Sequence, residues 1–187
     1  MKAKGVQYTY MDQHPISEYL SLAKRLAREA GIFALTAQNS ELRIEEKSNE
    51  FDLVTHVDKH NEEFIRSEVA KIYPEHSFLG EEDGASGDGE VKWIVDPIDG
   101  TNNYAMGIDY CAVTVALQRG ETTLLGVTQQ IHTGRVYHAR SGAGAFRREP
   151  GGEEVRLQVN TADRLGNSLL ATGFPYHRAE HSDNNAA

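Results

Sequence analysis

Two aspartates three residues apart, Asp96 and Asp99, follow an apolar run in the sequence Trp-Ile-Val-Asp-Pro-Ile-Asp-Gly-Thr-Asn at positions 93–102. Proline fixes its own φ, so the backbone between the aspartates is stiff and both carboxylates can face one point. Oxygen ligands of this kind suit a hard cation such as Mg²⁺. Gly100 has no Cβ to hinder a bound group, and a short helix beginning near Thr101 would offer backbone N–H groups to an anion. The segment therefore predicts magnesium-dependent phosphate chemistry.

A third carboxylate, Glu81, lies upstream in the sequence Gly-Glu-Glu-Asp at positions 80–83. Two carboxylates about 5 Å apart repel by roughly 3 kcal/mol at an effective dielectric of 20. Three acids gathered at one point must tolerate this repulsion, stay partly protonated, or bind a divalent ion that removes it. The alternative is that Asp96 and Asp99 are ordinary turn and cap residues. The apolar run before them, Thr101 after them and Glu81 together favour the metal site.

Composition restricts the class of protein. The chain has 187 residues, 39% of them hydrophobic, which is enough for one domain with a sizeable core. Its formal net charge of −9 argues against general nucleic-acid binding, which needs a basic surface. We expect no membrane partner, because no apolar stretch approaches the length of a membrane span. We expect a cytoplasmic location, because the first residues contain no apolar signal segment.

Other residues with metal-binding or nucleophilic chemistry are weaker candidates. The single cysteine, Cys111, excludes a disulfide within the chain. It lies in an apolar run, which favours a buried strand residue over a nucleophile. His56 and His60 are four residues apart and would suit zinc if they shared a helix face. We expect the helix to begin between them, so a zinc pair is not predicted.

The elements that must position these residues follow from the periodicity of apolar side chains. Helical spacing predicts one helix over residues 16–36 and another over residues 58–73, which ends before Pro74. A Gly-rich surface loop is expected at residues 83–89. Short apolar or alternating runs predict strands at residues 42–46, 77–79, 92–95, 110–118, 124–131, 135–139, 155–159 and 168–172. Two helices followed by a mainly antiparallel sheet indicate an α+β layered fold.

Several of these segments resemble one known family. The sequence Asp-Pro-Ile-Asp-Gly-Thr at positions 96–101 is similar to the signature of the inositol monophosphatase family of lithium-sensitive, Mg²⁺-dependent phosphatases. Further similar segments occur in the family's order between about residue 16 and residue 176. They are Lys47-Ser48, Asp52-Leu53-Val54-Thr55 with Asp58, Gly80-Glu81-Glu82, and Leu170-Ala171-Thr172-Gly173-Phe174-Pro175-Tyr176.

The resemblance implies a sugar-phosphatase-like fold and a role for each matched residue. Glu81, Asp96 and the Ile98 carbonyl would hold a first Mg²⁺, and Asp96 and Asp99 would share a second. Gly100 and Thr101 would bind the phosphate, while Asp58 and the Thr101 hydroxyl would orient the attacking water; Asp58 also suits the N-cap of the second helix. The implied catalytic residues are Asp58, Glu81 and Thr101, and the implied substrate contacts are Glu81, Ile98, Asp99, Gly100 and Thr101. Lys47 is either an anion contact or an ordinary surface lysine.

The expected substrate is myo-inositol monophosphate or a similar small phosphate monoester. The related substrates are fructose 1,6-bisphosphate, adenosine 3′,5′-bisphosphate and histidinol phosphate. The resemblance also implies a homodimer. We expect a lead-in over residues 1–14, a metal-binding domain over residues 15–160, and the start of a truncated C-terminal domain over residues 161–187, with the family's second α/β layer largely missing. The family's later Trp-Asp-x-Ala-Ala motif is absent, because Trp93 is the only tryptophan. An inactive or weakly active, cation-binding remnant is therefore the alternative function.

Overall fold

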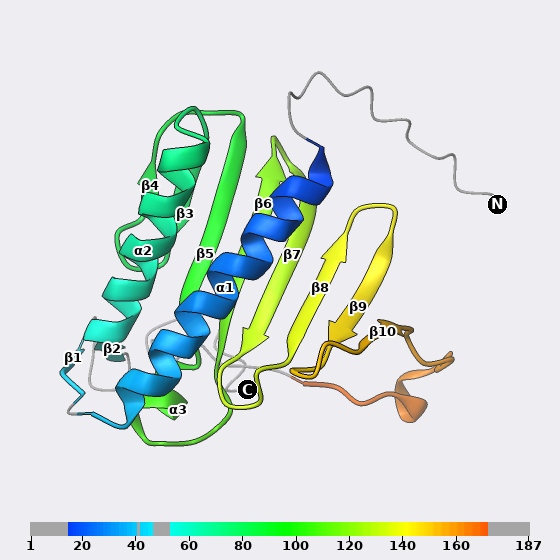
Figure 1. Cartoon of the computed structure of the whole chain (residues 1–187). Coiled ribbons are helices and arrows are strands. Elements are labelled where there is room, and N and C mark those ends of the chain that lie inside the picture. The colour runs from blue at the N-terminus through cyan, green and yellow to red at the C-terminus, as the bar shows by residue number, and fades with distance from the viewer. Residues whose placement is uncertain (1–14, 41, 47–52, 172–187) are drawn as a thin grey trace, which may run out of the picture.

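Two long helices lie on one face of a broad, mainly antiparallel sheet, as the sequence predicts (Figure 1). The computed structural model of the protein describes residues 15–40, 42–46 and 53–171. Helix α1 spans Ile16–Gln38 and crosses the middle of the sheet, where it contacts strands β6, β7 and β8. Helix α2 spans His56–Ile72 and packs beside α1 and against β5. The α+β fold class is thereby confirmed.

The described part of the chain forms one eight-stranded sheet in the order β10-β9-β8-β7-β6-β5-β3-β4. All neighbouring pairs are antiparallel except β3 and β5, which are parallel. The strands are β3 (Ser77–Gly80), β4 (Ala85–Ser86), β5 (Val91–Asp99), β6 (Ala112–Arg119), β7 (Thr122–Gln130), β8 (Val136–Arg140), β9 (Gly144–Arg148) and β10 (Glu154–Leu157). Strands β1 (Ile44–Glu46) and β2 (Leu53–Thr55) form a separate antiparallel pair.

The core lies between the helices and the sheet. Small side chains on the inner face of α1, such as Ala23, Ala27 and Ala30, are fully buried and allow the helix to approach the strands closely. Along β5 the burial alternates, and Trp93 is fully buried between the helices and the sheet. Its Nε1–H donates to His76 Nδ1 at 3.0 Å, so the one polar atom of the indole is satisfied. This packing fixes the strand that carries Asp96 and ends at Asp99.

Helix α2 begins two residues earlier than predicted, because Thr55 and not Asp58 is its N-cap. The Thr55 side chain accepts the Val57 N–H, and the Asp58 side chain accepts the Thr55 N–H, which completes a capping box. His56 and His60 therefore lie on the same helix, contrary to the prediction. His56 Nδ1 accepts the Arg43 N–H and His60 stacks on Phe33, and the absence of a zinc pair stays a prediction.

Some weak elements differ from their predictions. The loop over residues 83–89 contains the two-residue strand β4, and β9 was not predicted because its glycine and arginine content hides its alternation. Residues 168–171 form no strand, since Leu169 and Leu170 are exposed; Thr172 lies outside the described residues. None of the described helices combines the length and the apolar composition needed to span a membrane.

Candidate active site

A break in the β5–β6 ladder brings Asp96 and Asp99 together. In a regular strand, residues three apart point to opposite faces of the sheet. Here Asp96 pairs with Thr114 and Asp99 pairs with Ala112, so three steps along β5 match only two along β6. The extra residue is a β-bulge at Pro97 and Ile98, which changes the direction of the side chains that follow. The bulge explains how two aspartates at this spacing can serve one site.

Three carboxylates meet at this bulge, and we call Glu81, Asp96 and Asp99 the acidic corner. Glu81 follows β3, the parallel neighbour of β5, and its carboxyl group hydrogen-bonds that of Asp96. Burial, followed by the negative charge of Glu81 and Asp99, raises the pKa of Asp96 to about 8. Glu81 and Asp99 are exposed, whereas Asp96 is partly buried. The corner is therefore open to solvent on one side and electrostatically strained at Asp96.

Asp58 and Thr101 form a second part of the site. Thr101 begins the short helix α3 (Thr101–Ala105), and its Oγ1 lies 2.9 Å from Asp58 Oδ1 and 2.9 Å from the Ile98 carbonyl oxygen. The other oxygen of Asp58 accepts the N–H and the hydroxyl of Thr55 at 2.9 and 2.6 Å. Burial raises the pKa of Asp58, and these hydrogen bonds oppose the rise. The aspartate that completes the capping box is thus also the partner of Thr101.

Gly100 makes the tight turn between β5 and α3. Its φ of +87° lies in the left-handed region, where glycine is favoured. A Cβ at this position would lie 3.0 Å from the Tyr110 carbonyl oxygen. The turn is also fixed from α1, because the Tyr104 hydroxyl donates to the Ala34 carbonyl at 2.7 Å. Gly100 and Thr101 are therefore held rigidly next to Asp99.

Glu62, which sequence reasoning missed, holds the loop that carries Glu81. It is fully buried, and it accepts the backbone N–H of Glu82 at 2.7 Å and of Asp83 at 3.0 Å. Its charge is balanced by Arg66 at 2.6 Å. A Cβ added at Gly80 would overlap the Glu62 carboxyl group, so glycine is required for this contact. The sequence signal was present, since Glu62 and Arg66 are four apart on a predicted helix.

Asn61 is a further positioning residue that the sequence did not reveal. Its side chain is fully buried, and Nδ2 donates to the Ala30 carbonyl of α1 at 3.3 Å and to the Pro97 carbonyl of the bulge at 3.4 Å. Both helices are thereby linked to the backbone between Asp96 and Asp99. Only the tertiary structure shows this role, because an asparagine on a helix has many possible partners.

A cavity of about 260 Å³ adjoins the acidic corner. It is lined by Asp99 and Gly100 together with Tyr110, Thr128 and Tyr137. Cys111 also lines this cavity, with its Sγ 3.7 Å from His132 Nδ1. Burial and then the charges of Asp109 and Asp99 raise the pKa of the Cys111 thiol to about 11, which does not suit a nucleophile. The buried, unreactive cysteine predicted from the sequence is supported, although Cys111 precedes β6 and is not part of it.

The residues present fit a divalent cation at the acidic corner. Asp96 Oδ1 is buried and has no hydrogen-bond partner among the described residues, and its carboxyl group is opposed by two further acids. A cation would satisfy that oxygen and remove the repulsion. Within residues 15–40, 42–46 and 53–171, no group of three or more His, Cys, Asp and Glu side chains could hold a metal ion as placed, so a cation here would also need the Ile98 carbonyl and water as ligands. Lys47, the predicted anion contact, lies outside the described residues.

Comparison with known proteins decides the family. The inositol monophosphatase family model matches residues 16–187. The chain belongs to the inositol monophosphatase family. It is 36% identical over 174 residues to the Nus factor SuhB of Vibrio cholerae, covering 91% of this chain and 62% of that protein. It is also 36% identical to human inositol monophosphatase 1, covering 84% of this chain and 57% of that protein.

Solved structures agree with the family assignment. The inositol monophosphatase from Anabaena (Nostoc) superposes with a TM-score of 0.76 at 30% sequence identity, covering 91% of this chain and 61% of that chain. This member of the inositol monophosphatase family therefore has the helix-on-sheet fold of its relatives. It spans about three fifths of the length of the relatives that it matches.

Proposed function

We propose that this chain carries the catalytic part of a Mg²⁺-dependent phosphomonoesterase that hydrolyses myo-inositol monophosphate or a similar sugar phosphate. The observation that supports this function best is the half-buried Asp96 carboxyl group, which has a raised pKa, one unpartnered oxygen, and Glu81 and Asp99 beside it. Buried acids in this state are typical of metal sites in phosphoryl-transfer enzymes. Membership of the inositol monophosphatase family supports the same substrate class.

The proposed metal ligands are those of the acidic corner. Glu81, Asp96 and the Ile98 carbonyl would hold one Mg²⁺, and Asp96 with Asp99 would contribute to a second. When bound, such ions lower the pKa of a coordinated water and stabilise the charge of the phosphoryl group. The backbone of Gly100 and Thr101 would contact the phosphate, and the cavity beside Asp99 would receive the alcohol part of the ester.

Asp58 and Thr101 are proposed to position and deprotonate the attacking water. The Thr101 hydroxyl has a single hydrogen and two acceptors at 2.9 Å, Asp58 Oδ1 and the Ile98 carbonyl. When it donates to Asp58, the lone pairs of Thr101 Oγ1 remain free to accept a hydrogen bond from water. Asp58 would then be the final acceptor of the proton. Its raised pKa brings it closer to the range in which a carboxylate is an effective base.

The test is phosphate release from myo-inositol 1-phosphate by the purified chain, with Mg²⁺ binding measured by calorimetry on the same sample. Turnover that needs Mg²⁺ and is lost in Asp96→Asn supports the enzyme. Mg²⁺ binding without turnover supports the alternative, a cation-binding protein that is inactive by itself. If the chain shows neither Mg²⁺ binding nor turnover, both functions are contradicted. A homodimer, a cytoplasmic location and a domain boundary near residue 160 stay predictions from the sequence.

A further inference from the structure

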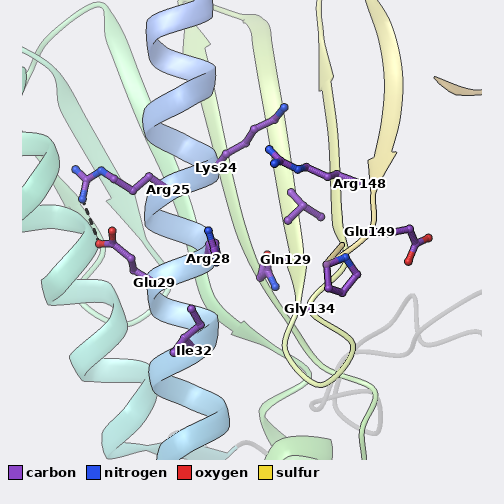
Figure 2. A pocket seen from close by; sticks show the side chains of 11 residues that line it. Lys24, Arg25, Arg28, Glu29, Ile32, Gln129, Gly134, Arg148 and Glu149 are labelled. Atoms are coloured by element: carbon purple, nitrogen blue, oxygen red, sulfur yellow. Dashed lines mark hydrogen bonds and ion pairs between the residues drawn. The ribbon is translucent and has the colours of Figure 1, made fainter. Parts of the chain in front are cut away.

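A groove of about 580 Å³ lies between helix α1 and the ends of strands β7, β8 and β9 (Figure 2). Its cationic wall consists of Lys24 and Arg28 from α1 and Arg148 from β9. Figure 2 shows Lys24 and Arg148 extending toward each other across the opening, while Arg25 points away toward Glu29. We call these three cations and the space between them the basic groove. Its volume is typical of small-molecule sites.

The basic groove is separated from the acidic corner by the thickness of the sheet. Successive side chains of a strand point to opposite faces. On β7, Gln129 lines the groove, whereas its neighbours Thr128 and Gln130 line the cavity next to Asp99. On β8, Val136 lines the groove and Tyr137 lines the other cavity. A ligand in the groove would therefore not touch the catalytic residues.

The positive charge of the groove is only partly neutralised by the protein itself. Two carboxylates line it, but Glu29 is paired with Arg25 at 3.1 Å, and Glu149 is paired with Arg135 and Arg147 at 2.9 and 2.8 Å. Arg28 and Arg148 have no ion-pair partner in the part of the chain that the structure describes. Two unpaired guanidinium groups at one cavity contrast with the net charge of −9 for the whole chain.

Lys24 is the third cation of the groove, and it shares one carboxylate with a histidine. Its Nζ lies 3.6 Å from Glu154, which is also hydrogen-bonded to His138. Burial lowers the pKa of Lys24, and repulsion from Arg148 lowers it further, while Glu154 acts in the opposite direction. The partly buried ammonium group of Lys24 therefore lies near the guanidinium group of Arg148. Glu154 pairs with Lys24, and Arg148 has no ion-pair partner among the described residues. An anion between them would remove the repulsion.

The floor of the groove has one polar side chain, Gln129, with apolar residues beside it. Gln129 is 3% exposed, and its Oε1 is buried without a hydrogen-bond partner among the described residues, although its Nε2 donates to the Gln130 carbonyl. An unpartnered buried acceptor favours a ligand that brings an O–H or N–H donor. Ile32, Val136 and Pro150 supply apolar surface beside it. The groove thus combines cations at its mouth, one acceptor and an apolar wall.

We propose that the basic groove is a second binding site, which takes a hydroxylated phosphate ester such as a sugar phosphate. The phosphate would lie between Arg28, Arg148 and Lys24, since guanidinium groups bind phosphate oxygens in a bidentate fashion. A hydroxyl of the ligand would donate to Gln129 Oε1. The carbon skeleton would cover the apolar wall. Because this site lies on the α1 face of the sheet, its ligand binds independently of the metal-dependent site.

Calorimetric titration of the whole chain with glucose 6-phosphate in EDTA tests the proposal. Without a divalent ion, the acidic corner is negatively charged and repels phosphate, so binding under these conditions reports the groove. Arg28→Glu and Arg148→Glu should each weaken binding at least tenfold. Arg140→Glu is the matched control, because Arg140 is an exposed arginine of β8 that does not line the groove; it should leave the affinity unchanged. Glucose should not bind, and inorganic phosphate should bind more weakly than the ester.

Three results would overturn the proposal. The wild-type chain does not bind glucose 6-phosphate in EDTA, or Arg28→Glu and Arg148→Glu bind it as tightly as the wild type, or Arg140→Glu loses as much affinity as these two variants. Arg28 and Arg148 make no ion pair in the described structure, so their replacement breaks none. If a charge reversal nevertheless prevents folding, Arg28→Gln and Arg148→Gln replace it. A second measurement uses the side-chain amide signal of Gln129 in the wild-type NMR spectrum. That signal must shift on titration with the ester if the ligand lies in the groove.

Discussion

Thr101 Oγ1 lies 2.9 Å from Asp58 Oδ1, which joins two residues 43 positions apart in the chain. Thr101 is the first residue of α3, and Asp58 belongs to the first turn of α2. The same hydroxyl lies 2.9 Å from the Ile98 carbonyl, so it has two acceptors for one hydrogen. The arrangement connects the capped start of α2 with the bulge of β5. A change in this hydroxyl should therefore affect both the proposed chemistry and the buried carboxyl group of Asp58.

Thr101→Val removes the hydroxyl and keeps the shape of the side chain. We expect kcat for myo-inositol 1-phosphate to fall by about 10²–10⁴, the usual contribution of a positioned proton acceptor and its partner. Stability should also fall, by about 1–3 kcal/mol, because the buried Asp58 Oδ1 loses its partner while Oδ2 keeps both hydrogen bonds from Thr55. Thr36→Val is the control, because its exposed hydroxyl donates to the Ile32 carbonyl within α1 and not to a residue of the site. Unchanged kcat in Thr101→Val would remove the hydroxyl from the mechanism.

Gly80→Ala should displace the loop that carries Glu81. The added methyl group overlaps the buried Glu62 carboxylate, which is fixed by Arg66 and by the N–H groups of Glu82 and Asp83. Overpacking of this kind costs about 1–3 kcal/mol, which urea denaturation can measure. We also expect Mg²⁺ affinity to fall, because Glu81 moves with the loop.

Gly126→Ala on β7 is the matched control for Gly80→Ala. A Cβ at Gly126 would meet no atom within 4 Å, and its backbone does not require glycine. Its stability and its Mg²⁺ affinity should stay at or slightly above the wild-type values. If Gly80→Ala behaves like this control, Glu62 does not fix the loop as described.

The main layers of the fold follow from local sequence patterns. The first helix was predicted at residues 16–36 and observed at Ile16–Gln38, because its apolar spacing is long and regular. The strands of the central hairpin were also found, since both are strand-like runs and are separated by the Gly-containing turn at residues 119–121. The start of α2 was misplaced, because Asp58 suits an N-cap as well as the third helical position of a capping box. Only the hydrogen bonds of Thr55 distinguish the two.

The proximity of the three acids could be predicted for a different reason, while their role as metal ligands stays a prediction. Asp96, Asp99 and Glu81 belong to short motifs in which type and spacing together indicate chemistry. The bulge that brings Asp96 and Asp99 together is a property of the β5–β6 register, which no single segment specifies. Glu62 and Asn61 act through buried contacts with distant backbone groups, so their roles become visible only when the tertiary structure is known.

Cys111 should be unreactive in the folded protein. Burial raises the pKa of its thiol to about 11, so at pH 8 the thiolate fraction is about 100-fold smaller than for a thiol of pKa 9.0. The nearby His132 does not offset this, although its Nδ1 lies 3.7 Å from Sγ. Alkylation by iodoacetamide at pH 8 should be at least tenfold slower in buffer than in urea, and Cys111→Ser should retain hydrolysis. Rapid alkylation of the native thiol together with loss of activity would instead indicate a cysteine nucleophile.

Asp96 should make both stability and Mg²⁺ binding depend on pH. Its pKa is raised from 3.8 to about 8 in the folded protein, so the folded state holds a proton that the unfolded state releases at lower pH. In EDTA, the free energy of unfolding should therefore decrease as pH rises from about 4 to about 8, by at most about 1.4 kcal/mol per pH unit. Mg²⁺ must displace this proton, so its affinity should rise by up to about tenfold per unit between pH 6 and pH 8.

Urea denaturation in EDTA and calorimetric Mg²⁺ titration, both at pH 6, 7 and 8, measure these two slopes. Asp96→Asn is the matched variant, because the amide keeps the size of the side chain and does not titrate. It should flatten the dependence of stability on pH in EDTA, and it should lose most of the Mg²⁺ affinity. Saturating Mg²⁺ should likewise reduce the slope in the wild-type protein, since a bound cation stabilises the ionised carboxylate. If Asp96→Asn keeps the wild-type dependence of the free energy of unfolding on pH, the titrating group is another residue. The raised pKa of Asp96 would then be contradicted.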